Sequence, residues 1–314
     1  MARIAVLDDY QRAAHGLADW SRLRGHEVTF FHEPLDDPAQ ALERFDVVCA
    51  MRERTAFPAE LFDRLPGLRL LVTTGMRNAA VDMDAAAAHG VTVCGTEVPS
   101  TPTAELTWGL ILALARRIPV EDRGMREGGW QTTVGIDLAG KTLGILGLGR
   151  LGSIVAGYGE AFRMRLVAWS ENLTAERAAE CGAELVAKDE LFSGADVVTI
   201  HLVLSRRTRG LVGARELGLM RPTAFLVNTS RGPIVDETAL LDALDAGTIA
   251  GAGIDVYDRE PLPADHPLRR APNTVLTPHL GYVTEDTYRV FYGQTVDDVE
   301  AWLAGTPVRV IGPT

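Results

Sequence analysis

Three polar residues with complementary chemistry, Arg231, Glu260 and His279, each follow an apolar run of the chain. A guanidinium can bind a carboxylate through two hydrogen bonds, and a histidine can exchange a proton with a hydroxyl group near neutral pH. A carboxylate beside that histidine favours the imidazolium form. The carboxyl ends of parallel strands share one edge of a sheet, so residues far apart in sequence can converge there. The three residues therefore predict an acid/base pair with a carboxylate anchor, which suits reduction of a carbonyl group.

Each of these residues also has a plainer interpretation. Arg231 could form a surface ion pair, Glu260 could be a solvated loop charge, and His279 could be a helix-cap or core histidine. All three, however, lie in turns marked by Gly or Pro: Ser-Arg-Gly-Pro, Arg-Glu-Pro and Pro-His-Leu-Gly. Their joint occurrence favours a common site.

A glycine-rich segment, Gly147-Leu-Gly-Arg-Leu-Gly152, follows the apolar run 142–146 and precedes a helical pattern. Gly147 and Gly149 allow a tight turn and close approach to a pyrophosphate, and Gly152 allows close helix packing. The N–H groups at the start of the helix suit an anion. The alternative is a Gly-rich turn without a ligand, but the flanking strand and helix favour dinucleotide binding.

The choice between NAD and NADP depends on the residues after the next strand. An NAD site usually has an acidic residue about 20 positions after the glycines, where it binds the ribose hydroxyls. Ser170 occupies that position and Glu171 follows it, while no Arg or Lys is present at 171–173. We therefore expect NAD as the cofactor, with NADP as an alternative and a modest preference between them.

Short runs rich in Val, Ile and Leu alternate with helical stretches along the whole chain, which indicates parallel βα units. The predicted strands are 3–8, 28–31, 46–50, 68–73, 92–94, 142–146, 165–169, 184–186, 197–201, 224–228, 252–256 and 274–277. A long apolar helix is predicted at about 103–117, with a Thr/Glu start typical of a capping sequence. Another is predicted at 284–304.

The pattern restarts after a Pro-, Ser- and Thr-rich patch near residue 100, which predicts two α/β domains, each a doubly wound parallel sheet. We expect a dinucleotide-binding domain at 100–283, inserted into a substrate domain formed by 1–99 and 284–314.

Composition narrows the function classes. The formal net charge of -11 is unfavourable for nucleic acid binding. Three widely spaced cysteines suggest neither a disulfide framework nor a metal site, and a cytoplasmic location is expected. The longest apolar run, 106–115, is too short to cross a membrane.

Four segments together are similar to the D-isomer-specific 2-hydroxyacid dehydrogenases: residues 147–152, 228–232, 255–261 and 277–281. This resemblance implies a Rossmann nucleotide-binding domain inserted into a flavodoxin-like substrate domain, and hydride transfer between NAD(H) and a small 2-oxo or 2-hydroxy acid, as in a glyoxylate/hydroxypyruvate reductase. It implies that His279 is the general acid, Glu260 its partner, and Arg231 the residue that binds the substrate carboxylate. The cofactor residues that it implies are Arg150 and Leu151 at the pyrophosphate, Leu202, Val203 and Thr208 on the adenosine side, and Thr229, Ser230 and Asp255 at the nicotinamide.

The resemblance also implies that the loop after residue 73 binds the substrate carboxylate through backbone N–H groups, around Gly75 and Met76. Arg77 stands in this loop where the family commonly has Gly. Arg77 and Arg52 could bind a second anionic group of the substrate, or could be solvated surface charges. The identity of the 2-oxo acid is left open.

The sequence disfavours three other functions. A non-enzymatic NAD-binding scaffold, similar to transcriptional co-repressors, is disfavoured by the complete Arg231, Glu260 and His279 set. A formate dehydrogenase would need Gln in place of Glu260, because no proton transfer accompanies hydride removal. A phosphoglycerate dehydrogenase with a regulatory tail would need further sequence after the last helix. From the apolar helix 106–115 and the resemblance, we expect a homodimer through the nucleotide-binding domain.

Overall fold

The computed structural model describes residues 1–312, which form two compact units. The first unit comprises residues 1–99 and 283–312, and the second comprises Ser100–Tyr282. The second unit is therefore inserted into the first, whose chain resumes at Val283, one residue before the predicted boundary.

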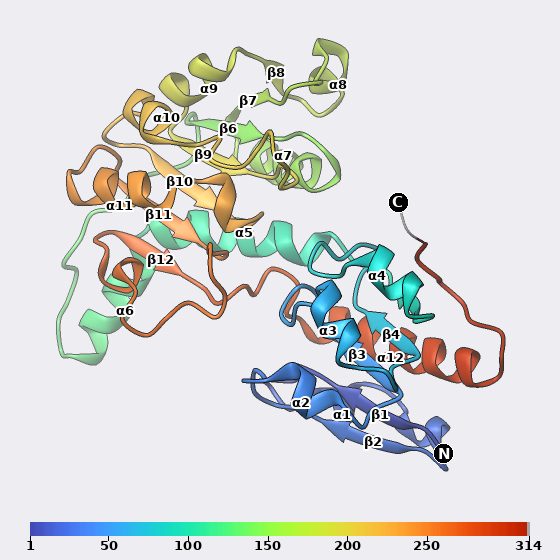
Figure 1. Ribbon diagram of the computed structural model, residues 1–314. Helices are drawn as coiled ribbons and strands as arrows, with labels where there is room; N and C mark the ends of the chain where they lie inside the picture. Colours follow the sequence, from blue (N-terminus) through green and yellow to red (C-terminus); the bar gives the residue numbers. More distant parts are fainter. Residues whose placement is uncertain (313–314) are drawn as a thin grey trace. The chain divides into compact units, whose positions relative to one another are not determined.

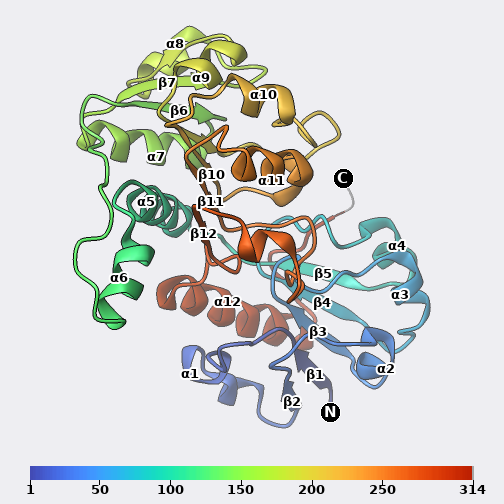
Figure 2. The same ribbon diagram turned by 90° about the vertical axis from the view of Figure 1, so that its left-hand side faces the viewer.

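The first unit is built on a five-stranded parallel sheet with the order β2-β1-β3-β4-β5. This is the order of the flavodoxin-like doubly wound fold. Figure 2 shows α1 and α12 on one face of the sheet, and α2, α3 and α4 on the other. Its elements are β1 Arg3–Val6, α1 Ala14–Leu17, η1 Trp20–Leu23, β2 Glu27–Phe30, α2 Pro38–Leu42, β3 Val47–Ala50, α3 Ala59–Asp63, β4 Leu70–Thr73, α4 Met83–Ala88, β5 Thr92–Gly95 and α12 Glu285–Leu303.

Local sequence explains where the helices of this unit begin. Asp37 and Asp82 accept hydrogen bonds from the first N–H groups of α2 and α4, and Thr284 does the same for α12. The central strands are buried on both faces, as β3 and β4 show along their whole length. Residues that follow these strands therefore gather at the carboxyl edge of a rigid sheet.

The second unit has a seven-stranded parallel sheet with the order β12-β11-β10-β9-β6-β7-β8. The order reverses between β6 and β9, as in the Rossmann fold. Its elements are α5 Thr101–Ala115, α6 Ile118–Arg126, β6 Thr142–Leu146, α7 Arg150–Ala161, β7 Arg165–Trp169, α8 Ala175–Glu180, β8 Glu184–Leu185, α9 Lys188–Gly194, β9 Val197–Ile200, α10 Ala214–Leu219, β10 Phe225–Asn228, η2 Gly232–Ile234, α11 Glu237–Asp245, β11 Gly251–Ile254, η3 Pro267–Arg270 and β12 Thr274–Leu276.

Two hydrophobic clusters cover the two faces of this sheet. One includes α5 and α7, and the other includes α9, α10 and α11; both layers can be followed in Figure 1. Helix α5 begins at Thr101, earlier than predicted, and its N-cap residue Ser100 accepts no side-chain cap hydrogen bond, so the predicted capping sequence is not used. Its apolar residues, including Trp108, Leu110 and Ile111, are buried inside the unit.

Among residues 1–312, no helix is both long and apolar enough to span a lipid bilayer. The same residues contain no group of three or more His, Cys, Asp or Glu side chains arranged to hold a metal ion.

Candidate active site

The glycine-rich loop connects β6 to α7 at the point where the strand order of the second unit reverses. Gly147 has a φ of +103°, and a Cβ there would lie 2.9 Å from the carbonyl oxygen of His201. A Cβ on Gly152 would lie only 2.1 Å from the oxygen of Gly147. Gly147 therefore requires glycine for both conformation and packing, and Gly152 requires it for packing.

Gly149 differs from these two glycines. It occupies the N-cap position of α7 in an extended conformation, and apart from Gly149 and its two neighbours in the chain no atom of residues 1–312 lies within 4 Å of the position a Cβ would take. Because Gly149 has no side chain that could accept hydrogen bonds, the first N–H groups of α7 are left for an anion. The Nδ1 atom of His201, behind this loop, is buried without a hydrogen-bond partner in residues 1–312, and burial lowers the pKa of this imidazole to about 3. The open space at Gly149 and the unpaired Nδ1 atom of His201 fit a bound nucleotide.

The other predicted cofactor residues surround the same edge. Arg150 is exposed at the first position of α7, whereas the side chain of Leu151 packs against the core. Ser170 is half-buried and Glu171 is exposed directly after β7. After β9, Leu202 packs on the core and Val203 is 81% exposed.

Thr208 stabilises the loop that follows β9 through hydrogen bonds. Its hydroxyl donates to the carbonyl of Val203 at 2.7 Å and accepts from the N–H of Ser205 at 2.8 Å. These contacts hold the loop that carries the exposed apolar side chain of Val203. Contact between Val203 and the adenosine part of the cofactor stays a prediction.

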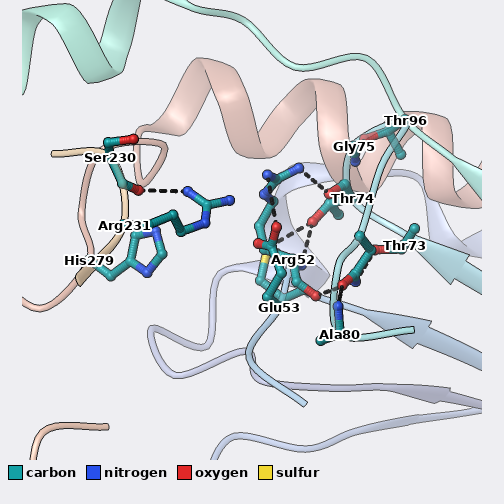
Figure 3. Close-up of polar contacts among 12 residues, drawn as sticks. Arg52, Glu53, Thr73, Thr74, Gly75, Ala80, Thr96, Ser230, Arg231 and His279 are labelled. Atoms are coloured by element: carbon teal, nitrogen blue, oxygen red, sulfur yellow. Dashed lines mark hydrogen bonds and ion pairs between the residues drawn. The ribbon is translucent and has the colours of Figure 1, made fainter. Parts of the chain in front are cut away.

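The loop after β10 carries Arg231 and is held by its own polar residues. Asn228 accepts from the N–H of Ser230 at 3.0 Å and donates to the carbonyl of Arg231 at 3.0 Å. Thr229 and Thr107 share a hydrogen bond of 2.7 Å, and the hydroxyl of Ser230 donates to the carbonyl of Leu202. The Arg231 guanidinium donates to the Ser230 carbonyl at 2.7 Å (Figure 3). Arg231 is thus presented by a rigid loop.

His279 and Glu260, which the sequence places in separate turns, meet in the structure. The Nδ1 atom of His279 lies 2.5 Å from Oε2 of Glu260. The second oxygen of Glu260 accepts from the N–H of Tyr257 at 2.9 Å. Both side chains keep partial solvent access, 18% for His279 and 32% for Glu260. Since Nδ1 is engaged, Nε2 is the ring nitrogen left to contact a substrate.

Asp255 fixes the backbone around His279. Its carboxylate is fully buried and accepts from the hydroxyl of Thr277 at 2.6 Å and from the N–H groups of Leu280 and Gly281 at 2.7 and 2.9 Å. Burial raises the pKa of the Asp255 carboxyl, and these hydrogen bonds act against that rise. The contacts stabilise His279 in a left-handed conformation with a φ of +55°. Contact between Asp255 and the nicotinamide carboxamide stays a prediction.

Tyr257 connects the three turns and was not singled out from the sequence. Its hydroxyl donates to the carbonyl of Thr277 at 2.9 Å, and its N–H holds Glu260. A Cβ on Gly232 would lie 2.1 Å from the backbone carbon of Tyr257, so the turn after Arg231 packs directly on the Tyr257 backbone. The sequence does contain a signal for Tyr257, because it is the only aromatic residue of the segment 255–261.

In the first unit, Arg52 follows β3 and Gly75 follows β4. The Arg52 guanidinium donates to the carbonyl of Thr74 at 2.9 Å and lies 3.6 Å from Glu53 (Figure 3). A Cβ on Gly75 would lie 1.9 Å from Nη1 of Arg52, and Gly75 has a φ of +105°. Arg52 is therefore packed on the glycine of the loop, with 16% of its side chain exposed, and is not a solvated surface charge.

The rest of this loop is fixed by hydrogen bonds of Asn78, whereas its Met76 and Arg77 side chains are exposed. Asn78 donates to the carbonyl of Arg52 at 2.7 Å and to the hydroxyl of Thr73 at 2.8 Å. Met76 and Arg77 are exposed. The structure thus brings Arg52 and Gly75 into contact, while the side chains of Met76 and Arg77 point to solvent.

Comparisons with known proteins show the family to which this chain belongs. The family description "D-isomer specific 2-hydroxyacid dehydrogenase, NAD binding domain" matches residues 108–281. A glyoxylate reductase of Aeropyrum pernix is 42% identical over 238 residues, covering 73% of this chain and 71% of that protein. A D-3-phosphoglycerate dehydrogenase of Archaeoglobus fulgidus is 36% identical over 262 residues, covering 82% of this chain and 50% of that protein. The chain therefore spans about half the length of the latter relative.

Solved structures show the same similarity over the whole fold. A phosphoglycerate oxidoreductase from Vibrio cholerae matches with a TM-score of 0.93 and 36% identity, covering 97% of this chain and all of that one. An NAD-dependent formate dehydrogenase from Staphylococcus aureus, solved in complex with NAD, matches with a TM-score of 0.85 and 28% identity over 99% of each chain. With the family match across more than half of the residues, the chain belongs to the D-isomer-specific 2-hydroxyacid dehydrogenases, with NAD as the cofactor.

Proposed function

We propose that this enzyme transfers a hydride between NAD(H) and a small 2-oxo or 2-hydroxy acid that carries one carboxylate, of the glyoxylate or hydroxypyruvate class. The observation that carries this proposal is the 2.5 Å contact between His279 and Glu260 on the same sheet edge as Arg231. When bound, NADH supplies the hydride. The protein must supply a proton to the carbonyl oxygen and a cation for the carboxylate.

We assign these roles to three side chains. His279, in its imidazolium form, donates a proton from Nε2 to the substrate oxygen, and the carboxylate of Glu260 stabilises the positive charge on the ring. Arg231 binds the substrate carboxylate and polarises the carbonyl group. Because Asp255 and Tyr257 fix the backbone on both sides of the pair, little reorganisation is needed at the moment of transfer.

The contacts of Arg52 and Arg54 favour a substrate without a phosphate group. Arg52 is bound to Thr74 and lies beside Glu53, whose negative charge is unfavourable for a second anion. Arg54 donates to the carbonyl of Asp8 at 2.7 Å and lies 4.6 Å from the ring centre of Tyr10. Both guanidinium groups are therefore engaged in holding loops of the first unit. Arg77 is exposed and is the remaining cation of the loop.

A substrate panel tests this proposal. The absorbance at 340 nm should fall when NADH is mixed with the enzyme and glyoxylate or hydroxypyruvate, and kcat/KM should be lower for 3-phosphohydroxypyruvate. Efficient use of the phosphorylated acid in preference to the others would instead support a phosphoglycerate dehydrogenase. Absence of turnover with every 2-oxo acid would favour the non-enzymatic scaffold.

We also propose a homodimer through the second unit, but on a different surface from the one expected. The apolarity of α5 is explained by burial within its own unit, so it provides no argument for a dimer. Exposed apolar side chains instead occur on α6 and the segment after it: Ile118, Val120, Met125, Trp130 and Val134. Light scattering at micromolar concentration should give twice the chain mass, and Trp130→Ser with Met125→Ser should reduce it. A parent monomer would contradict the proposal.

A further inference from the structure

The chain returns to the sheet of the first unit after α12. Residues 306–311, called here the return segment, are seen in Figure 1 as the red trace that leaves α12. The N–H of Gly95 donates to the carbonyl of Arg309 at 3.0 Å, and Val310 forms an antiparallel bridge with Cys94. The return segment thus pairs with β5 through one antiparallel bridge, at the edge of a sheet whose strand pairs are parallel.

An ion pair between Arg309 and a buried carboxylate anchors this segment to α12. The Nε and Nη2 atoms of Arg309 lie 3.0 and 2.9 Å from Oδ1 of Asp298, whose carboxylate is fully buried. Nη2 also donates to the carbonyl of Gln294 at 3.0 Å. The side chain of Gln294 in turn accepts from the N–H of Glu97, two residues after the end of β5, at 2.8 Å. Arg309 and α12 therefore hold the end of β5 from two sides.

The end of β5 is packed against the loop that follows β4. A Cβ on Gly95 would lie 2.5 Å from the carbonyl oxygen of Gly75 and 2.8 Å from the Cδ1 atom of Ile311. The hydroxyl of Thr96 accepts from the N–H of Gly75 at 3.0 Å (Figure 3). Ile311 and the Gly75 backbone thus pack at the same face of Gly95. Because this region is closely packed, a shift of the return segment must also displace the Gly75 backbone.

We propose that Arg309 and Ile311 are positioning residues for the loop 74–77, which they control through β5. This inference rests on the proposed function and on the expectation, from the family resemblance, that backbone N–H groups of this loop bind the substrate carboxylate. Neither side chain contacts the substrate. They set the place of the Gly75 backbone, and loosening them weakens substrate binding without changing the proton transfer by His279.

Steady-state kinetics on four variants of the full chain test the inference. Ile311→Ala and Arg309→Ala should raise KM for hydroxypyruvate by about tenfold, with kcat and the KM for NADH within about twofold of the parent. Arg309→Lys should recover part of the loss, because it keeps the charge next to Asp298. Arg22→Ala is the control, since Arg22 also pairs with α12, through Asp297 and Glu300. Arg309 lies 3.8 Å from the same Asp297, and this variant leaves that contact and the contact with Asp298 in place.

Hydrogen exchange gives a second measurement that needs no substrate. Peptides covering residues 72–80 should exchange faster in Ile311→Ala and Arg309→Ala than in the parent, and at the parent rate in Arg22→Ala. Unchanged KM and unchanged exchange in both variants would overturn the inference, as would a general loss of kcat and thermal stability without a specific change in KM. If the parent fails to reduce any 2-oxo acid, the proposed function fails, while the exchange result still decides whether the return segment controls the loop.

Discussion

Gly149→Ala should weaken cofactor binding without lowering the stability of the folded protein. Apart from Gly149 and its two neighbours in the chain, a methyl group at this position meets no atom of residues 1–312 within 4 Å. The backbone there is extended, with φ -80° and ψ -160°, and φ is negative, as alanine requires. The folded protein should therefore be as stable as the parent. If the pyrophosphate lies at the start of α7, the methyl group occupies its place and removes at least one charge-assisted hydrogen bond.

Such a hydrogen bond contributes about 1.5–3 kcal/mol, so the Kd for NADH should rise roughly 10- to 150-fold. The assay is a fluorescence titration of NADH, with thermal unfolding measured on the same samples. Gly157→Ala is the matched control, because it also adds a methyl group to α7 in open space and should leave Kd unchanged. Gly152→Ala, in contrast, should lower stability as well as binding, since its Cβ would lie 2.1 Å from a carbonyl oxygen. Parent-like affinity in Gly149→Ala would refute the placement of the pyrophosphate.

Three further predictions follow from individual contacts. Glu171→Arg should turn the modest preference for NADH toward NADPH, because the exposed negative charge after β7 is replaced by a cation. If the ratio of kcat/KM for NADH to kcat/KM for NADPH is the same in the variant as in the parent, this prediction is wrong. Arg231→Lys should lower kcat/KM by about 100-fold, since Lys cannot form the two-pronged carboxylate contact, and an unchanged value would make Arg231 structural. Burial raises the pKa of the Asp298 carboxyl to about 7. The protonated Asp298 therefore contributes stability that is complete below about pH 4 and is lost as pH rises through about 7. Over that interval the free energy of unfolding of the parent should fall relative to that of Asp298→Asn. Parallel pH profiles of the two proteins would contradict a raised pKa at Asp298.

The strands were predictable from the sequence because each is an apolar run bounded by Gly, Pro or polar residues. Thr142–Leu146 and Arg165–Trp169 form β6 and β7 with the predicted limits. Other predicted limits differ by up to two residues, as for β1, which ends at Val6 where the sequence suggested Asp8. At β1 the chain turns into a left-handed conformation at Asp8, which apolarity alone cannot indicate.

Contacts between distant side chains were harder to predict. The types of Arg231, Glu260 and His279 indicated their chemistry, but the left-handed backbone at His279 depends on Asp255, whose hydrogen bonds come from a different turn. Similarly, nothing in the composition of the return segment shows that Arg309 binds a buried carboxylate.

Burial explains why the apolarity of α5 is not evidence for a dimer, while the dimer itself stays a prediction. An apolar helix has the same sequence pattern whether it is covered by its own unit or by a second chain, and only the structure shows that Trp108 and Ile111 are buried within the unit.

The rate of NADH oxidation with hydroxypyruvate, compared between the parent and His279→Ala, tests the assigned acid most directly. The variant removes the proton donor and leaves the carboxylate anchor, so kcat should fall by about 100-fold or more while NADH binding is retained. A variant that reduces hydroxypyruvate at nearly the parent rate would show that His279 does not donate the proton.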